Sequence, residues 1–261
     1  MQGYGGLRTA ICVSGLPNKD LLMTVRVCSL CWGTAWERYG RTFAQTFADY
    51  WPADVELVMV TDRFIGLPRG KQAPLELING YRAFLDRWSS EMAAMGHRAP
   101  AGTKTNENGY SWRHDAVKWM PQALAPIPGI EGLEDGDIFV WFDADTETTA
   151  TVPAGWIESL LDGADVACIR RPGRHTEIGF YAMRMSPGTR RVLRLFADFY
   201  LNDSVFKLTE WHSAFVWDRA LETEPELKVS DLNPTGARGH AWPKTPLAAC
   251  TEHHKGKRKD Q

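Results

Sequence analysis

Hydrophobic and polar positions along the first half of the chain predict strands that are each followed by a helix. Residues 24–31 (TVRVCSLC) have the alternation and the β-branched content of a strand. Aromatic residues then recur every three or four positions from Trp36 to Tyr50, which predicts an amphipathic helix that Pro52 ends. Residues 55–60 (VELVMV) have the composition of a second strand. The order is therefore strand, helix, strand.

A second helical stripe and a third strand continue this order. Large apolar side chains from Leu77 to Met95 are spaced as on one face of a helix. After a polar loop, the stretch SWRHDAVKWM predicts a third helix, with Ser111 as its N-cap and Pro121 as its interruption or end. Residues 138–142 (IFVWF) are the third strand. This alternation predicts an α/β fold with a mainly parallel sheet, whose ligands bind beyond the carboxyl ends of the strands.

The second half of the chain predicts two more strands and two more helices. The strands are expected at 165–170 and 178–183. One helix begins with Ser186 as N-cap and Pro187 at its first position, and another begins near residues 209–210. The sheet is therefore expected to continue into this half.

We expect three regions along the chain. Residues 1–22 are rich in Gly, Pro and Asn and are expected to be a poorly ordered extension. Residues 23–150 are expected to form a nucleotide-sugar-binding half. Residues 151–261 are expected to form an acceptor-binding half with a C-terminal metal- and phosphate-binding tail.

Composition and charge exclude several classes of protein. With 261 residues and 44% hydrophobic content, the chain can fill the core of one large α/β domain or two small ones. A formal net charge of -2 does not by itself indicate a nucleic-acid partner. The five cysteines are scattered and odd in number, which argues against a disulfide scaffold and for a cytoplasmic location. We find no apolar run of the roughly 18 residues that a membrane helix needs, and no signal-peptide core.

Two carboxylates follow the third predicted strand. Asp143 and Asp145 flank a single alanine at its carboxyl end. Two such groups on a tight turn repel each other and lose hydration unless a cation neutralises them. Mg²⁺ and Mn²⁺ prefer oxygen ligands and often bridge to substrate phosphates. The pair therefore predicts a site for a metal diphosphate, the alternative being solvated loop residues or a helix cap.

The end of the chain carries groups that suit the same chemistry. In the stretch HHKGKRK at 253–259, an imidazole can complete a metal shell and Gly256 lets backbone approach a phosphate closely. The basic residues at 257–259 can neutralise that phosphate. The alternative is a disordered basic tail, but the carboxylate pair favours phosphate chemistry.

These two motifs resemble those of a known family. FDAD after an apolar strand, with HxxGxxK at 253–259, resembles the metal and nucleotide-sugar site of glycosyltransferases with the GT-A fold, particularly the glycogenin-like group. The resemblance covers most of the chain. It implies a Rossmann-like GT-A fold, a nucleotide diphosphate sugar donor (most simply a uridine one) and Mn²⁺ or Mg²⁺ as cofactor.

The resemblance also implies roles for individual residues on the donor side. The implied metal ligands are Asp143, Asp145 and His253, with His254 in place of His253 if the register shifts by one residue. The implied phosphate contacts are Gly256 and Lys259. The implied nucleotide contacts are Cys31, Trp32, Gly33 and Thr34 after the first strand, and Asp62 after the second. Arg113, Asp115 and Lys118 resemble the helix beside the nucleotide, and a solvated helical face with ion pairs is the alternative.

The acceptor side is less sharply indicated. The family often begins a helix with an acidic residue near the reacting sugar carbon, and Glu210 matches this loosely, in TEWH instead of Asp-Gln. If the reaction inverts, Glu210 is the first choice for the general base and Glu177 the second. If the reaction retains configuration, Glu210 would stabilise the cationic sugar. For Glu210 the alternative is a favourable charge at a helix start. His175 and Glu177, in RHTEIGF before a strand, are a second candidate cluster on the acceptor side, with a solvated loop as the alternative.

The acceptor itself is suggested only by a general likeness of WFDADT and TEWH to small phage glycosyltransferases. Some of these modify hydroxymethylated bases in DNA, so we consider hydroxymethylated pyrimidines in DNA as the acceptor. Positive potential for a phosphate backbone would come from six arginines: Arg170, Arg171, Arg174, Arg190, Arg191 and Arg194. The alternatives are a glycan or protein acceptor, a nucleotidyltransferase, a metal-dependent nuclease, and a silent nucleotide-sugar-binding module. The oligomeric state is not indicated.

Overall fold

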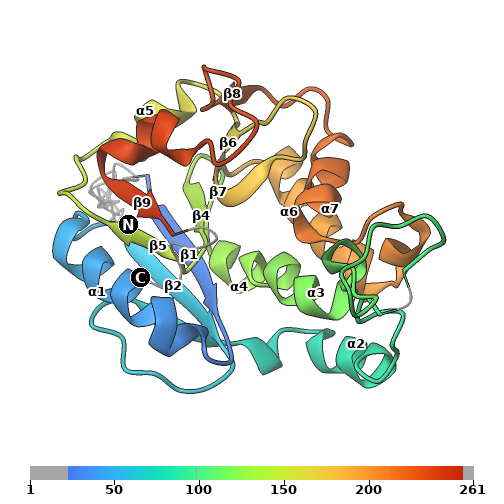
Figure 1. Cartoon of the computed structure of the whole chain (residues 1–261). Coiled ribbons are helices and arrows are strands. Elements are labelled where there is room, and N and C mark those ends of the chain that lie inside the picture. The colour runs from blue at the N-terminus through green and yellow to red at the C-terminus, as the bar shows by residue number, and fades with distance from the viewer. Residues whose placement is uncertain (1–22, 98, 255–261) are drawn as a thin grey trace, which may run out of the picture.

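The structure is a computed structural model that describes residues 23–97 and 99–254. The expected extension at 1–22 lies outside the described residues, as do the expected phosphate contacts Gly256 and Lys259. Within the described part, one large sheet lies between two layers of helices (Figure 1).

The central sheet has seven strands in the order β3-β2-β1-β4-β7-β6-β8. The strands are β1 (Val25–Cys31), β2 (Glu56–Thr61), β3 (Lys71–Pro74), β4 (Ile138–Phe142), β6 (Val166–Ile169), β7 (Glu177–Arg184) and β8 (Val229–Asp231). Among the described strands of this sheet, β7 alone runs against its neighbours and pairs antiparallel with β4 and β6. The other neighbouring pairs are parallel. The predicted α/β class with a mainly parallel sheet is therefore confirmed.

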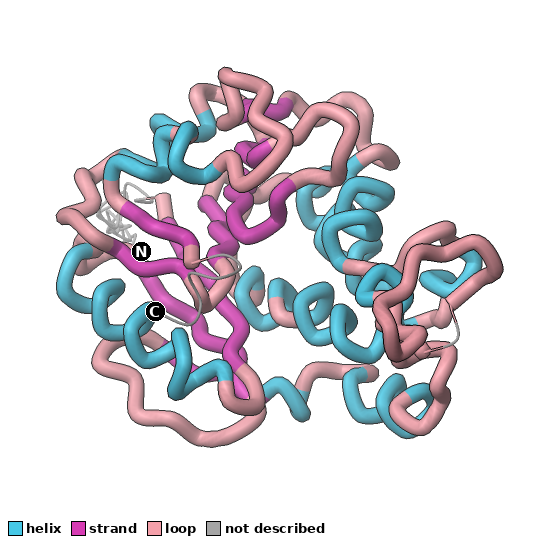
Figure 2. The backbone as a smooth tube through the Cα atoms, in the orientation of Figure 1, coloured by secondary structure: helices cyan, strands magenta, loops and turns pink. Residues whose placement is uncertain are grey.

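The helices cover both faces of this sheet (Figure 2). They are α1 (Arg41–Tyr50), α2 (Tyr81–Trp88), α3 (Ala116–Leu124), α4 (Pro126–Ile130), α5 (Trp156–Leu161), α6 (Pro187–Leu201) and α7 (Ser213–Leu221). A π-helical turn at Trp36–Gly40 precedes α1. Short 3-10 turns occupy Leu75–Leu77, Trp112–His114, Ser204–Lys207, Trp242–Lys244 and Pro246–Ala249.

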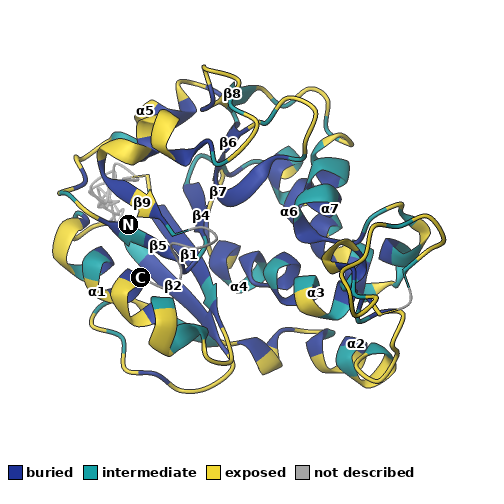
Figure 3. Cartoon of the chain, in the orientation of Figure 1, coloured by how far each residue is buried: buried dark blue, intermediate teal, exposed yellow. Residues whose placement is uncertain are grey.

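Alternation along the strands divides the core into two clusters. On β4, Phe139 and Trp141 face the layer that contains α2, α3, α4, α6 and α7. Val140 and Phe142 face the opposite layer, which contains α1, α5 and the turns near the C-terminus. Both faces of β4 are buried (Figure 3), which explains its unbroken apolar sequence.

A second, two-stranded sheet joins the region after β4 to the end of the described chain. Its strands are β5 (Thr146–Thr148) and β9 (Thr251–His253), which pair antiparallel with Thr146 opposite His253. Figure 1 shows β9, coloured red, beside β5. The three-residue strands were not predicted, because each is too short to show a periodic pattern.

Three predicted helix boundaries were wrong. The stripe from Leu77 to Met95 forms a helix only over α2, because Gly80 at φ 84° interrupts the helical backbone before it. Asp115, and not Ser111, caps α3 through a bond from the Lys118 N–H. Pro121 neither interrupts nor ends α3, which continues to Leu124.

The last helix also begins later than predicted. Helix α7 starts at Ser213, with His212 as its N-cap, and not near residues 209–210. The segment before it is extended because it docks on the turn before α3: the Trp211 N–H donates to the Arg113 carbonyl at 2.7 Å. By contrast, the predicted start of α6 is confirmed, with Ser186 as N-cap in a capping box and Pro187 at its first position.

The described cysteines are structural. Cys28, Cys31, Cys168 and Cys250 are buried and free. Burial raises the pKa of Cys31 and of Cys168 to about 12, so both thiols are protonated and unreactive at neutral pH. None of the helices in residues 23–97 and 99–254 is long and apolar enough to cross a membrane.

Candidate active site

A cleft of about 890 Å³ opens beyond the carboxyl end of β4. Because β7 is antiparallel to β4, its amino end lies at this same edge of the sheet. Helix α3 and the start of α7 complete the walls. The cleft contains Asp143, Asp145 and His253, and also Arg113, Glu210, His175 and His212. Residues from distant parts of the sequence therefore meet in one polar cavity.

Asp143 is held by three neighbours. Its Oδ1 accepts a hydrogen bond from Gln122 Nε2 at 2.8 Å and from Trp141 Nε1 at 3.0 Å. Its backbone N–H donates to the Gly179 carbonyl on β7 at 2.9 Å. Gln122 is in turn oriented by Ser213, whose hydroxyl donates to Gln122 Oε1 at 2.6 Å. One carboxylate oxygen of Asp143 is thus fixed, and the carboxyl orientation with it.

Asp145 lies against His253. The His253 Nε2 atom is 3.0 Å from Asp145 Oδ1, and the two side chains are only 3% and 8% exposed. The pairing of β5 with β9 places His253 here, and the His254 N–H donates to the Asp145 carbonyl at 2.9 Å. The next side chain turns away, and His254 Nε2 lies 3.2 Å from Glu147 Oε2. The structure therefore brings His253, and not His254, to the carboxylate pair.

These three residues fit a divalent cation. One ligand atom from each of Asp143, Asp145 and His253 lies within 4.8 Å of the others. Gly179 keeps space beside them: a Cβ there would lie 3.4 Å from His253 Nε2 and 3.5 Å from Asp143 Oδ2. The buried Nδ1 of His253 has no hydrogen-bond partner among the described residues. Two carboxylates and one imidazole are a donor set that Mn²⁺ and Mg²⁺ accept.

The electrostatics of the pair agree with this fit. Burial, and then the neighbouring charge of Asp145, raise the pKa of Asp143 to about 6. The His253 imidazole and the Trp141 hydrogen bond oppose this shift. Ionised Asp143 is therefore held at a cost in free energy that a bound cation would relieve.

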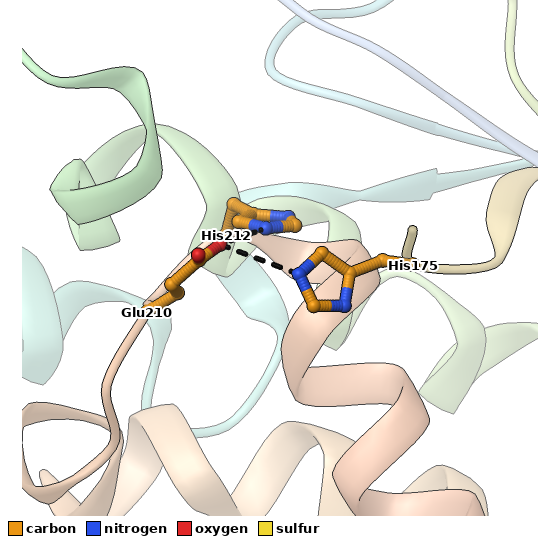
Figure 4. A group of neighbouring side chains, drawn as sticks. All are labelled: His175, Glu210 and His212. Atoms are coloured by element: carbon orange, nitrogen blue, oxygen red, sulfur yellow. Dashed lines mark hydrogen bonds and ion pairs between the residues drawn. The ribbon is translucent and has the colours of Figure 1, made fainter. Parts of the chain in front are cut away.

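A second group of titratable side chains lies in the cleft around Glu210 (Figure 4). The Glu210 carboxylate accepts a bond from Arg113 Nη1 at 2.9 Å through Oε1. Its Oε2 lies 2.8 Å from His212 Nε2 and 3.4 Å from His175 Nε2. The other ring nitrogen of His175, Nδ1, lies 3.4 Å from Asp218 Oδ2.

The remaining acceptor-side candidate, Glu177, is engaged by a cation. Arg171 Nη1 donates to Glu177 Oε2 at 3.0 Å, and both side chains are largely buried. Arg171 also donates to the carbonyls of His175 and Thr176. Glu177 lines the cleft at the amino end of β7, with its charge already balanced.

The predicted helix-face residues have separate positions. Arg113 and Lys118 line the cleft. Asp115 caps α3 through Oδ1 and accepts the Tyr110 hydroxyl at 2.9 Å through Oδ2. Its carboxylate is therefore occupied by local structure.

The predicted nucleotide loop lies at the same edge of the sheet. Trp32, Gly33 and Thr34 are exposed after β1, and the Gly33 N–H donates to Asp62 Oδ2 at 2.8 Å. Because β1 and β4 are parallel neighbours, this loop lies near the carboxylate pair. Cys31 instead packs in the core at 1% exposure, with no thiol surface for a ligand.

Sequence reasoning missed several residues that orient the predicted ones. Gln122 and Ser213 fix Asp143, Gly179 makes room beside it, and Asp218 faces His175. Each is a single polar or small residue in a predicted element, where only the three-dimensional contacts reveal a role.

Three of the six arginines that we considered as contacts to a DNA backbone form ion pairs with acidic residues of this chain. Arg171 pairs with Glu177, Arg190 with Asp135 and Arg191 with Glu224. Such pairing reduces the positive potential that this set offers to a phosphate backbone.

Comparisons with known proteins found similarity among solved structures only. No protein family model matches the chain, and no curated protein matches it. Among solved structures, the apo form of mouse xyloside xylosyltransferase 1 is similar, with 9% sequence identity and a TM-score of 0.43. The alignment covers 82% of this chain and 86% of that one. A likeness of this degree carries no information about the reaction that this chain performs.

Proposed function

We propose that the chain is a metal-dependent glycosyltransferase, which moves a sugar from a nucleotide diphosphate sugar to an acceptor hydroxyl. The observation that supports this most is the group Asp143, Asp145 and His253 at the carboxyl edge of a parallel sheet, inside a cleft large enough for a nucleotide sugar. The motif resemblance to GT-A enzymes supports the same reaction and a uridine diphosphate donor.

On the donor side, Asp143, Asp145 and His253 would hold Mn²⁺ or Mg²⁺. When bound, this ion would neutralise the charge of the donor diphosphate and of the leaving nucleotide. Gln122 fixes Asp143, and the strand β9 fixes His253, so that the ligand set is preorganised. The exposed loop at 32–34 with Asp62 would receive the nucleotide, and Gly256 and Lys259 would contact the phosphates.

The acceptor side carries aromatic rings as well as Glu210. Trp112 is 46% exposed at the cleft and lies 4.8 Å from the His212 ring, between centroids. Such a face suits stacking against a sugar or a base ring. Hydroxymethylated DNA remains one proposal for the acceptor, less favoured because of the paired arginines, and a glycan or protein hydroxyl is the other.

The decisive experiment is calorimetric titration with UDP in the presence of Mn²⁺. For Asp145→Asn we expect a loss of metal-dependent binding of about tenfold or more, because a ligand to the ion becomes neutral. Glu147→Gln, two residues away and directed toward His254, is the matched control. Equal affinities for the wild type and Asp145→Asn would contradict the metal assignment.

The product separates this reaction from its closest alternative. With UDP-glucose, a glycosyltransferase or its hydrolytic side reaction releases UDP. A nucleotidyltransferase would instead cleave within the diphosphate and release a sugar phosphate. Binding without any turnover would indicate a silent nucleotide-sugar-binding module.

A further inference from the structure

The group around Glu210 has a hydrogen-bonding pattern that its sequence does not reveal. It contains two imidazoles and two carboxylates, and the guanidinium of Arg113. Residues 111–114 and 209–211 hold it together, because His114 Nε2 lies 3.0 Å from the Thr209 carbonyl and the Trp211 N–H donates to the Arg113 carbonyl. Glu210 is therefore fixed from both sides of the cleft.

The ring of His212 has a defined tautomer. Its Nδ1 accepts the Phe215 N–H at 3.3 Å, as the N-cap of α7. A neutral imidazole carries one proton, so that proton must be on Nε2, which then donates to Glu210 Oε2 at 2.8 Å. Burial, followed by the charge of His175, lowers the pKa of His212 to about 4. His212 is thus a neutral donor at physiological pH.

The ring of His175 has carboxylate oxygens at both nitrogens. Asp218 Oδ2 faces Nδ1 and Glu210 Oε2 faces Nε2, each at 3.4 Å. A neutral ring can donate to only one of them and presents a lone pair to the other. The imidazolium donates to both. Both carboxylates can therefore accept a hydrogen bond from this ring only when both of its nitrogens carry a proton.

We propose that Glu210, His175 and Asp218 form the site that accepts the proton of the acceptor hydroxyl. Glu210 is the base, and His175 is the group that then holds the proton. This rests on the proposed glycosyl transfer. His212 and Arg113 are positioning residues, which orient the Glu210 carboxylate in the cleft.

The O–H bond of the acceptor breaks and its proton passes to Glu210, then to Nε2 of His175. The acceptor oxygen forms a bond to the anomeric carbon of the sugar. The bond from that carbon to the phosphate oxygen breaks, and its electron pair leaves with the nucleoside diphosphate. The cluster gains one proton and the leaving group one negative charge.

A metal ion in this second group is the competing interpretation, since two histidines and a glutamate are a possible zinc set. Coordination through Nε2 of His212 would require loss of its proton while Nδ1 still caps α7, which leaves an imidazolate. The guanidinium of Arg113 on Glu210 adds a further positive charge at the same place. Both observations favour a proton over a cation.

The first test measures the protons directly. Long-range nitrogen-15 NMR spectra of the histidine rings in the full chain would be recorded from pH 5 to 8, with assignment from His175→Gln and His212→Gln. We expect His212 to keep its proton on Nε2 alone, and His175 to become doubly protonated as the pH falls. A His212 ring protonated on Nδ1, or Zn²⁺ at micromolar concentration displacing the Nε2 proton in an Asp145→Asn background, would overturn the proposal.

The second test measures turnover with UDP-glucose, Mn²⁺ and water as the acceptor. We expect Glu210→Gln to lower UDP release by about 100-fold, within the range for general bases. Asp218→Asn should move the acid limb of the pH-rate profile to lower pH, because the imidazolium of His175 loses a neighbouring negative charge. The groups that face these residues, Arg113, His212 and Arg171, are unchanged in both variants.

Controls separate this proposal from the donor-site assignment. Glu222→Gln removes a carboxylate near the end of the same helix as Asp218, where its partner is Arg219, and should leave the pH profile unchanged. UDP and Mn²⁺ should bind Glu210→Gln and Asp218→Asn as tightly as wild type, and both variants should unfold near the wild-type temperature. If Glu210→Gln and Asp218→Asn bind UDP normally and also keep the turnover and pH profile of the wild type, the proposed proton-accepting site is contradicted. The donor-site assignment would not be affected. If the wild-type protein does not bind UDP, the proposed function is contradicted. The NMR spectra would still test the tautomer of His212 and the protonation of His175.

Discussion

His253, the last residue of β9, and His254, which follows it, contact different carboxylates, those of Asp145 and Glu147. We expect His253→Gln to weaken the Mn²⁺-dependent binding of UDP by about tenfold or more, since a metal ligand is lost. His254→Gln should leave it within about twofold, because this ring lies beside Glu147. Titration calorimetry on both variants gives the comparison, and a larger effect for His254 would show that the strand register is shifted.

We expect Asp143 to lower the stability of the metal-free folded protein at neutral pH and to contribute to cation binding. Its pKa is raised in the folded state, so the folded protein favours the protonated form and loses stability as the pH rises through about 6. Asp143→Asn removes this charge and should raise the free energy of unfolding of the metal-free protein at pH 7.5 by at most about 3 kcal/mol. The gain should vanish near pH 4.

Thermal and urea unfolding at both pH values measure this effect. The same variant should lose Mn²⁺-dependent stabilisation, because Asn is a weaker ligand. If the variant is less stable than the wild type at pH 7.5, burial and the charge of Asp145 do not destabilise the ionised Asp143 carboxylate.

At the scale of elements, strong local signals predicted the structure well. Helix α6 has a Ser-Pro start and a full apolar stripe, and it forms where the sequence indicates. The apolar stripe from Leu77 to Met95 predicted a longer helix than α2, because the spacing of apolar residues does not reveal that the helical backbone is interrupted at Gly80. Strands β5 and β9 were not predictable, since three residues carry no period and their pairing joins segments about one hundred residues apart.

The same contrast holds for the candidate site. Asp143, Asp145 and His253 were predicted from motifs that name residue types, and the structure brings them together. Gln122, Gly179 and Asp218 were missed, since their roles depend on β7 running antiparallel and on α3 and α7 meeting. The register that selects His253 over His254 also needed the strand pairing.

The cap of α6 gives a test at this scale. Ser186 accepts the Thr189 N–H and the Thr189 hydroxyl accepts the Ser186 N–H. We expect Ser186→Ala to lower the free energy of unfolding by about 1 kcal/mol, the usual value of an N-cap. Urea unfolding measures it. Ser159→Ala, whose exposed hydroxyl bonds only within its own helix, is the control and should change stability by less. Equal stabilities for wild type and Ser186→Ala would mean that the cap contributes nothing.

At the scale of the molecule, the two expected halves share one sheet. Strand β4 belongs to residues 23–150 and pairs with β7 of residues 151–261, so the proposed donor and acceptor sides lie on the same sheet. The division into a nucleotide-binding and an acceptor-binding half remains a prediction about function. The cleft lies where the two halves meet.

Removal of residues 255–261 tests the proposed phosphate contacts of the donor. All helices and strands that the structure describes lie before residue 255, so we expect the unfolding temperature to stay within a few degrees of wild type. UDP release from UDP-glucose should fall by about tenfold or more, because Gly256 and Lys259 are the proposed phosphate contacts. A shortened chain with full turnover would remove both residues from the site.

The pairing of β5 with β9 has a consequence for how the protein is made. Asp145 and His253 are 108 residues apart, so the two carboxylates leave the ribosome long before the imidazole that joins them. A chain still being synthesised therefore carries Asp143 and Asp145 without the third residue of the proposed cation-binding group. Under the proposed metal assignment, all three residues can hold the ion only after β9 has been translated and has paired with β5.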